Sequence, residues 1–224
     1  MQTLLLLDLD GTIIDTPHYD AWRNAARGIG GQELSYEQYI ACIAGRPRLE
    51  GASRLLALKD GGSHGSSNRP DAVCALAEAK QREFLRLSER TALFDDAQRL
   101  LQRIEAARQP VRFYTASQNA PRLFHAVLRK SGVFCNQKIE VVRQQPDQTR
   151  EALFRALLGD FGHEGVTLID DSPYAADAAC YIGIRGCQVR RHELDPVADN
   201  PRCVILSSLD DLIIPLGTSE EVAI

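Results

Sequence analysis

Short apolar runs flanked by polar turn residues constrain the fold of this chain more than any other feature of its sequence. Three of them lie at Thr3–Leu9, Val111–Thr115 and Val166–Ile169. A run of this length is typical of a strand that is buried on both faces of a parallel sheet. Gly186–Arg190 and Cys203–Leu206 are weaker candidates for strands. The chain is therefore expected to contain a parallel sheet with apolar faces.

Helical patterns occupy the stretches between these runs. They span Asp96–Ala107, Ala120–Lys130, Thr149–Phe161 and Ala175–Ile182. Strands that alternate with helices build a doubly wound sheet, because right-handed crossovers place the helices on both faces. The sequence therefore predicts an α/β fold with a Rossmann-like parallel sheet core.

The interval from residue 16 to residue 90 breaks this alternation and contains helical patterns alone. The four predicted helices are Tyr19–Ile29, Ser35–Ile43, Leu49–Leu58 and Ala72–Ser88. The stretch Gly61–Asn68, rich in Gly and Ser, is predicted to be a flexible loop, and the tail after Leu216 is predicted to fray. We predict a core domain of residues 1–15 and 91–224. A small helical cap of residues 16–90, inserted after the first strand, is expected to close over the end of that strand.

Charge and cysteine usage exclude several classes of protein. The formal net charge of −4 offers no general attraction to nucleic acid or to an acidic membrane surface. The apolar stretch Leu4–Leu7 is followed at once by Asp8, which argues against a signal peptide or a membrane span. Six cysteines without a C-x-x-C pair are typical of reduced thiols used as small apolar residues. We expect a cytoplasmic protein with no nucleic-acid or membrane partner, and the sequence gives no indication of its oligomeric state.

Carboxylates are concentrated at the ends of two predicted strands. The first strand ends in Asp8-Leu9-Asp10-Gly11-Thr12, and the third ends in Asp170-Asp171-Ser172. Ligands of an open parallel sheet bind at the carboxyl ends of its strands, so these segments are expected to meet there. Four carboxylates at one point repel one another unless a cation neutralises them, and oxygen ligands without nearby His or Cys favour Mg²⁺ over zinc. The predicted Mg²⁺ ligands are Asp8, Asp10, Asp170 and Asp171.

The pattern Asp-x-Asp-Gly-Thr also suits phosphoryl transfer. A carboxylate such as that of Asp8 can attack phosphorus, and Asp10, two residues on, can act as the general acid and base. Gly11 lets the backbone turn sharply, so that N–H groups there can bind phosphate oxygens. Thr115, at the end of the second predicted strand, can donate a hydroxyl hydrogen bond to the same phosphate. These residues indicate a magnesium-dependent phosphoryl-transfer enzyme.

The motifs resemble those of the haloacid dehalogenase (HAD) superfamily of phosphatases and phosphomutases, over nearly the whole chain. The resemblance implies that Asp8 is the nucleophile and a metal ligand, and that Asp10 is the general acid and base with its backbone carbonyl on the metal. It also implies that Thr115 and Ala116 bind the phosphate, and that the pair Asp170-Asp171 completes the Mg²⁺ site. In this superfamily an Asp at the position of Asp10 goes with phosphoryl transfer. Carbon–halogen and carbon–phosphorus cleavage are therefore disfavoured.

Within the superfamily, the predicted cap is similar to that of β-phosphoglucomutase and its sugar-phosphatase relatives. The resemblance implies that Arg48, in the loop after Gly45, binds the non-reacting phosphate of the substrate, and that Lys80 is a second cation of the cap. Two solvated charges on helices are the alternative for this pair. His18 lies near the position of a cap His that gates the acid/base in the mutases, although its spacing differs by two residues. Asn119 ends a run, from Thr115, that is similar to the Ser-Ala-Ser-Lys-Asn run of those mutases, and it joins the substrate-binding candidates.

The sequence departs from the family at the third motif, a Lys usually followed by Pro, because Gln145 occupies the Lys position. That Lys bridges the nucleophilic carboxylate and the transferring phosphate, two anions that repel by ~4 kcal/mol at about 4 Å and an effective dielectric near 20. An amide recovers only part of this, since hydrogen bonds to charged groups contribute ~1.5–3 kcal/mol. Arg143 or, more distantly, Lys138 could supply the cation, so Arg143 and Gln145 are candidate phosphate-binding residues. Another basic stretch, Arg190-Arg191-His192, is predicted to be a solvated loop.

The leading functional hypothesis is a Mg²⁺-dependent phosphatase that hydrolyses a small phosphorylated metabolite, such as a sugar phosphate, through an aspartyl-phosphate intermediate. Two alternatives remain open. One is an intramolecular phosphomutase of the β-phosphoglucomutase type. The other is a catalytically impaired homologue that binds a phosphorylated ligand or a partner protein, for which the absence of the Lys at Gln145 is the support.

Overall fold

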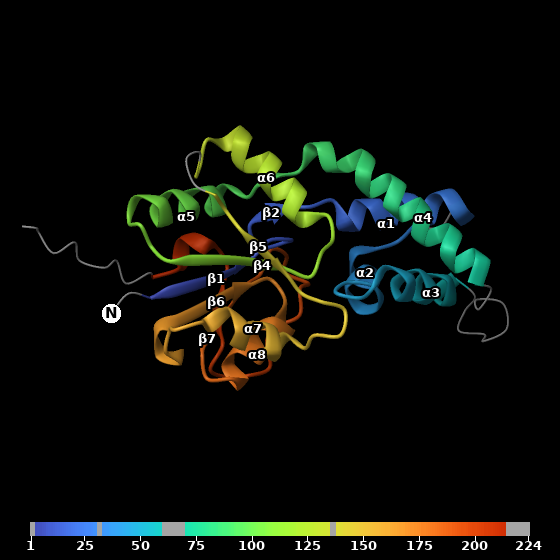
Figure 1. The fold of residues 1–224 in the computed structure, drawn as a ribbon. Helices are drawn as coiled ribbons and strands as arrows, with labels where there is room; N and C mark the ends of the chain where they lie inside the picture. The colour runs from blue at the N-terminus through green and yellow to red at the C-terminus, as the bar shows by residue number, and fades with distance from the viewer. Residues whose placement is uncertain (1–2, 31–32, 60–69, 135–137, 214–224) are drawn as a thin grey trace, which may run out of the picture. The chain divides into compact units, whose positions relative to one another are not determined.

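A computed structural model describes residues 3–30, 33–59, 70–134 and 138–213 (Figure 1). The chain divides into two compact units. The core unit comprises the segments up to residue 15 and from residue 92 onward, and the helical unit comprises residues 16–91. The predicted loop Gly61–Asn68 and the tail after Leu216 lie outside the described residues.

A parallel sheet of six strands forms the centre of the core unit. Its strands, in spatial order, are β5 (Val141–Arg143), β4 (Val111–Thr115), β1 (Leu4–Asp8), β6 (Val166–Asp170), β7 (Arg185–Val189) and β8 (Val204–Leu206). All five pairings in this sheet are parallel. The chain moves outward from β1 through β4 to β5 and then crosses to β6 on the other side of β1. This reversal confirms the predicted doubly wound topology and makes the ends of β1, β4 and β6 the expected place for a ligand.

Helices cover both faces of this sheet. They are α5 (Asp95–Ala106), α6 (Ala120–Ser131), α7 (Arg150–Leu158) and α8 (Pro173–Tyr181), with the 3₁₀ turns η2 (His163–Gly165) and η3 (Leu209–Asp211). Figure 1 shows α5 and α6 on one face and α7 and α8 on the other. Leu153, Phe154 and Leu157 of α7 pack with Leu6 and Leu168 of the sheet in one buried cluster. The sequence placed the end of α7 at Phe161. It ends earlier, since the chain turns at Gly159 with φ of +58°.

The edge strand β5 was not predicted from the sequence. It has only three residues, and two of them, Val142 and Arg143, are exposed. A strand that is short and open to solvent lacks the buried apolar run by which the other strands were recognised. Its pairing with β4 places Arg143 opposite Thr115. This is a tertiary contact that the local sequence does not predict.

The helical unit consists of α1 (His18–Gly30), α2 (Tyr36–Cys42), α3 (Arg48–Lys59) and α4 (Pro70–Leu87), followed by the 3₁₀ turn η1 (Ser88–Arg90). Each helix lies within two residues of its predicted bounds. Ser35 begins α2 with a capping box, in which its hydroxyl accepts from the Gln38 N–H. A buried cluster around Trp22, Ile43 and Leu76 holds the helices together. None of the helices that the structure describes combines the length and apolar character that a bilayer span requires.

A short antiparallel ribbon marks the two ends of the inserted segment. It pairs β2 (Ile14–Asp15) with β3 (Ala92–Leu93), so that Ile14 lies opposite Leu93. The Phe94 N–H also donates to the Ile13 carbonyl. The segment that follows β1 is therefore tied to the segment that re-enters the core unit.

Candidate active site

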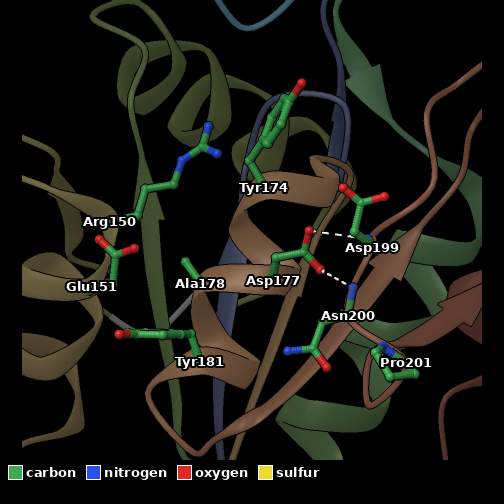
Figure 2. A pocket seen from close by; sticks show the side chains of 9 residues that line it. All are labelled: Arg150, Glu151, Tyr174, Asp177, Ala178, Tyr181, Asp199, Asn200 and Pro201. Carbon is green, nitrogen blue, oxygen red and sulfur yellow. Dashed lines mark hydrogen bonds between the residues drawn. The ribbon is translucent and has the colours of Figure 1, made fainter.

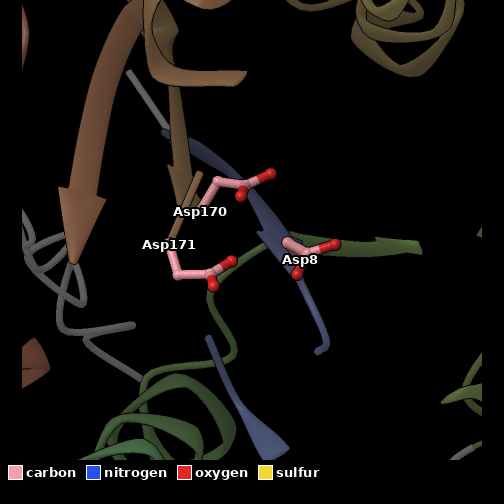
Figure 3. A group of neighbouring side chains, drawn as sticks. All are labelled: Asp8, Asp170 and Asp171. Carbon is pink, nitrogen blue, oxygen red and sulfur yellow. The ribbon is translucent and has the colours of Figure 1, made fainter. Parts of the chain in front are cut away.

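Three carboxylates meet at the ends of the two central strands. Asp8 is the last residue of β1, Asp170 is the last residue of β6, and Asp171 follows it. Each offers an oxygen that lies within 4.8 Å of those of the other two, and Figure 3 shows the three side chains gathered at the strand ends. The parallel register causes this proximity, because Leu7 pairs with Ile169 and the next residues are the two acids.

The cluster is electrostatically strained in the absence of a cation. Burial, followed by the charges of Asp170, Asp171 and Asp10, raises the pKa of Asp8 well above its usual value. Burial and the charge of Asp170 raise the pKa of Asp171 well above its usual value too. The Asp170 pKa is raised by burial, although hydrogen bonds to its carboxylate oppose the shift. Buried carboxylates that repel one another, with oxygen as the sole donor type, fit a hard divalent cation such as Mg²⁺.

Asp10 and two threonines complete the arrangement around the cluster. The Thr115 hydroxyl donates to Asp10 Oδ2 at 3.2 Å and accepts from the Ser117 N–H at 3.0 Å. The Thr12 hydroxyl accepts from the Asp171 N–H at 2.8 Å and donates to Asp171 Oδ1 at 3.4 Å. The structure thus brings together the four predicted acids and Thr115, all within the core unit.

Gly11 serves this site by leaving room for a carboxylate. Its φ is +77°, and a Cβ at this position would lie 2.3 Å from Asp171 Oδ2. Its own N–H donates to the Ile14 carbonyl at 3.0 Å, so the predicted contacts with phosphate would have to come from other N–H groups of the turn. The amides of Ile13 and Ile14 donate to the Leu9 carbonyl in the same turn. Three amides of the turn are thereby used within the turn itself.

Tyr114 is a member of the site that the sequence did not suggest. Its hydroxyl donates to Asp170 Oδ2 at 2.6 Å in a buried hydrogen bond, and the Ser172 N–H donates to Asp170 Oδ1 at 2.7 Å. Burial, followed by the charges of Asp170 and Asp8, raises the pKa of Tyr114 well above its usual value, so the phenol remains a donor. Both oxygens of Asp170 are thereby fixed in place.

Neither Gln145 nor the two cations proposed to replace the third-motif Lys is bonded to Asp8 in the described part of the chain. Gln145 is exposed, and its side-chain amide donates to the Arg143 carbonyl at 3.1 Å within the same turn. Lys138 forms an exposed ion pair with Glu140 at 3.5 Å. Arg143 is exposed at the end of the edge strand. In the described part of the chain, no hydrogen bond or ion pair joins any of these three side chains to Asp8. The role of Arg143 or Lys138 as the replacement cation therefore stays a prediction.

Arg150 is a cation whose charge reaches the cluster. It is the first residue of α7, where the Thr149 hydroxyl caps the helix by accepting from the Ala152 N–H. Its charge lowers the pKa of Asp170 and of Tyr114 against the effect of their burial. Its Nη1 donates to the Ser172 hydroxyl at 3.3 Å. Arg150 lies five positions after Gln145, so no match to the family motif would have suggested it.

Arg191 is a structural clamp, and its prediction as part of a solvated loop is wrong. Its guanidinium donates to the Gly11 carbonyl at 3.1 Å, to the Thr12 carbonyl, and to Asp96 Oδ2 at 2.7 Å. It also stacks on the Phe94 ring, 4.0 Å from the centroid. Arg191 therefore holds in place the turn that follows Asp8 and Asp10.

The predicted substrate-binding residues of the cap lie in the helical unit. Lys80 is buried, and its Nζ lies 3.0 Å from His18 Nδ1 and 4.5 Å from the Phe84 ring centroid. The alternative of a solvated charge is therefore wrong for Lys80. Arg48 is exposed and donates to Gln81.

Two further candidates lie after β4 in the core unit. Asn119 precedes the first turn of α6, and its N–H donates to the Ser117 hydroxyl at 3.3 Å. Ala116, next to Thr115, is exposed. Both therefore follow the strand end that carries Thr115.

A surface hollow of about 760 Å³ adjoins Arg150 (Figure 2). It is lined by Arg150, Glu151, Tyr174, Asp177, Ala178, Tyr181, Asp199, Asn200 and Pro201. Asp177 accepts from the N–H groups of Asp199 and Asn200, which fixes the wall opposite α7. Asp8, Asp10, Asp170 and Asp171 do not line this hollow. The candidate active site and the hollow are therefore separate features, and Arg150 lies next to both.

No protein-family model and no curated protein matches the chain. Solved structures match over almost its whole length. An archaeal β-phosphoglucomutase from Pyrococcus sp. strain ST 04 is 23% identical, with 94% of this chain and 95% of that chain covered and a TM-score of 0.65. A HAD hydrolase of family IA, variant 3, from Entamoeba histolytica is 18% identical, with 96% of each chain covered and a TM-score of 0.66. A predicted phosphoglycolate phosphatase from Haemophilus somnus is 15% identical, with 94% and 96% covered and a TM-score of 0.70. The chain therefore has the haloacid dehalogenase fold that its motifs predicted.

Proposed function

We propose that this protein is a Mg²⁺-dependent phosphatase that hydrolyses a small phosphorylated metabolite through an aspartyl-phosphate. The main support is the convergence of Asp8, Asp170 and Asp171 at the carboxyl ends of the central strands. Asp10 and Thr115 lie beside them. Proteins with this fold include the predicted phosphatase and the phosphomutase named above, which is consistent with phosphoryl transfer.

Asp8, Asp170 and Asp171 would hold the Mg²⁺, with the Asp10 carbonyl as a further ligand by resemblance. When bound, the ion would neutralise the clustered acids and the charge of the transferring phosphoryl group. The Asp8 carboxylate attacks phosphorus in line, and the alkoxide leaves with a proton from Asp10. Asp10 then takes a proton from the water that hydrolyses the acyl phosphate. The Thr115 hydroxyl, already 3.2 Å from Asp10 Oδ2, can donate to a phosphate oxygen.

Arg150 and Tyr114 offset part of the missing motif-three charge in this proposal. Arg150 already moderates the negative charge around Asp170. The Tyr114 hydroxyl donates a hydrogen bond to Asp170 Oδ2. A nearby cation and a neutral hydrogen-bond donor lower the repulsion that the incoming phosphate meets, although neither reproduces a Lys between nucleophile and phosphate.

The direct test is phosphate release from an aryl phosphate and from a panel of phosphorylated metabolites, with and without Mg²⁺. The wild type is expected to release phosphate only with the metal. Asp8→Asn is expected to abolish the activity, because an amide does not attack phosphorus. Asp15→Asn is the matched control, since Asp15 is exposed on β2 and should be dispensable. If no substrate of the panel releases phosphate with Mg²⁺, the impaired-homologue alternative is favoured instead.

The phosphomutase remains the second candidate because of His18 and Lys80. In the helical unit, Lys80 Nζ lies 3.0 Å from His18 Nδ1. A buried cation such as Lys80 is suited to bind a second anionic group of the substrate. Incubation with β-glucose 1-phosphate and a bisphosphate primer separates the two activities. Formation of the 6-phosphate isomer indicates a mutase, and free phosphate alone indicates a phosphatase. Lys80→Met should impair a mutase more strongly than it impairs hydrolysis of an aryl phosphate that lacks a second anionic group.

A further inference from the structure

A pair of thiols in the core unit lies outside the candidate active site. Cys180, in the last turn of α8, and Cys203, just before β8, form a hydrogen bond with 3.0 Å between their sulfur atoms. Cys180 is buried, and Cys203 is partly exposed. Both are free thiols in this structure. Two sulfur atoms this close need only a small approach to bond covalently.

The backbone around the pair holds the two sulfur atoms together. The N–H groups of Asp199 and Asn200 donate to Asp177 on α8 at 3.1 and 2.9 Å. The Arg202 guanidinium donates to the Cys180 carbonyl at 2.9 Å, and the Cys203 N–H donates to the Asn200 carbonyl at 2.9 Å. Three of these hydrogen bonds dock the segment 199–203 on α8, and the fourth, from the Cys203 N–H, closes a turn within the segment. The proximity of the thiols is a property of the docked segment and does not depend on two mobile side chains alone.

We propose that Cys180 and Cys203 form an oxidant-reactive dithiol site that a two-electron oxidant of the hydroperoxide class converts to a disulfide. A hydroperoxide first oxidises the partly exposed Cys203 thiol to a sulfenic acid and is itself reduced to water or an alcohol. The Cys180 sulfur then attacks the Cys203 sulfur, and the sulfenic hydroxyl leaves as water with the Cys180 proton. Overall, two thiols and one hydroperoxide give one disulfide, one water, and a second water or an alcohol.

The surroundings set the direction and the speed of this reaction. Cys203 is the entry point because Cys180 is buried. The Cys203 thiol donates to Asp177 Oδ1 at 3.5 Å, so a carboxylate is present to accept its proton. Burial, together with the neighbouring Cys180 and Asp177, raises the Cys203 pKa, which keeps the thiolate scarce at neutral pH. Oxidation should therefore need excess peroxide and a long incubation, and should be followed by rapid capture by the adjacent thiol.

The test is peptide mapping of the full-length protein after treatment with hydrogen peroxide, under non-reducing conditions. A cross-linked peptide that contains Cys180 and Cys203, lacks two hydrogen atoms and separates on reduction is expected. Cys203→Ser should eliminate it. Cys74→Ser is the control, since Cys74 is an exposed thiol of the helical unit and its loss should leave the cross-link unchanged.

Two other results would overturn the proposal. One is stable sulfinic acid at Cys203 with no cross-link, and the other is a Cys180–Cys187 link in its place, since Cys187 is the third thiol of this region. A second measurement does not depend on peptide recovery. The disulfide closes the chain between residues 180 and 203, so the oxidised wild type should melt at least about 5 °C above the reduced form. Oxidised Cys203→Ser should show no such rise. Neither measurement depends on phosphatase activity, so each proposal can fail without the other.

Discussion

At the residue scale, Gly11 combines a backbone constraint with a steric one. Its positive φ alone strains any residue with a Cβ, and the same Cβ would collide with the Asp171 carboxylate. A substitution there should therefore disturb the metal site as well as the turn. Gly183, with φ of +86° and nothing near its would-be Cβ, has the backbone constraint alone.

Gly11→Ala should therefore lower the free energy of unfolding more than Gly183→Ala does. At both positions, the strain of a residue with a Cβ at positive φ costs ~1–2 kcal/mol. Only Gly11→Ala should also lose the Mg²⁺-dependent rise in melting temperature, because Asp171 must move away. Thermal melts of both variants with and without Mg²⁺ check this. Equal Mg²⁺ responses would mean that Asp171 relaxes freely and that the collision has no consequence.

The charge of Arg150 is the second feature at this scale. We expect Arg150→Gln to lower kcat by roughly tenfold to a hundredfold, the range that a ~1.5–3 kcal/mol charge-assisted interaction implies. Arg150→Lys should retain part of the rate. Arg155→Gln, an exposed change on the same helix, is the control. Steady-state kinetics of Arg143→Gln and Lys138→Gln should show little change. A larger loss of kcat in Arg143→Gln than in Arg150→Gln would favour Arg143 as the replacement for the third-motif Lys.

At the element scale, the core unit depends on contacts that fix loops to one another. The loop after β7 reaches the turn after β1 through Arg191, and Asp96 of α5 joins the same network. Asp96 Oδ2 also accepts from the Ser208 hydroxyl and the Leu209 N–H. The loop after β7 and the segment at Ser208 are thus bonded directly to the Asp96 carboxylate, and Arg191 joins the turn after β1 to them. Hydrogen bonds from Arg191, Leu209 and Ser208 hold the Asp96 pKa below its usual value despite partial burial.

Arg191→Met should destabilise the protein by about 2–4 kcal/mol, because it leaves a mostly buried carboxylate without its cation. Arg99→Met removes a bidentate contact to Asp210, but that pair is exposed, so the loss of stability should be much smaller. Urea denaturation of both variants measures the difference. Because the Asp96 pKa is lowered on folding, its contribution is present above the unfolded pKa of about 3.9 and disappears as the pH falls through the lower folded value. If the two variants lose the same stability, Arg191 is an ordinary surface contact.

At the scale of the whole molecule, the acidic cluster makes stability depend on pH and on metal. The folded pKa values of Asp8 and Asp171 are raised, so the folded state binds more protons than the unfolded state above pH ~4. Their effect is stabilising at low pH and is lost as the pH rises through the folded values. A divalent cation should replace those protons.

Without metal, the melting temperature should therefore rise as the pH is lowered from 8 toward about 5.5. Mg²⁺ at a hundred times its Kd should stabilise the protein at pH 8 by ~2.7 kcal/mol, or roughly 5–10 °C, and by less at pH 5.5. Calorimetry with Mg²⁺ and with a chelator checks this independently of activity. Asp171→Asn should flatten the pH dependence and remove the Mg²⁺ response. An unchanged response in that variant would place the ion elsewhere.

The sequence predicted much of the fold because its signals are local. The buried strands appear as apolar runs, and the helices of the 16–90 interval appear within two residues of their final bounds. The four acids could be grouped without coordinates, since the ends of parallel strands must meet at one edge. The edge strand β5 was missed because its pairing with β4 is the only thing that defines it.

What the sequence determined alone was that Asp8, Asp10, Asp170 and Asp171 would lie together with Thr115 at the ends of the strands. A register between parallel strands follows from apolar runs that must be buried, so the residues at their ends were predictable. What only the tertiary structure decided was the surrounding charge. Tyr114, Arg150 and Arg191 act through contacts between segments 56 to 180 positions apart or through space, and no local pattern records them. Electrostatic interactions depend on distance in the folded protein and not on distance along the chain, which is why the sequence did not single out Arg150 as a charge near the acids.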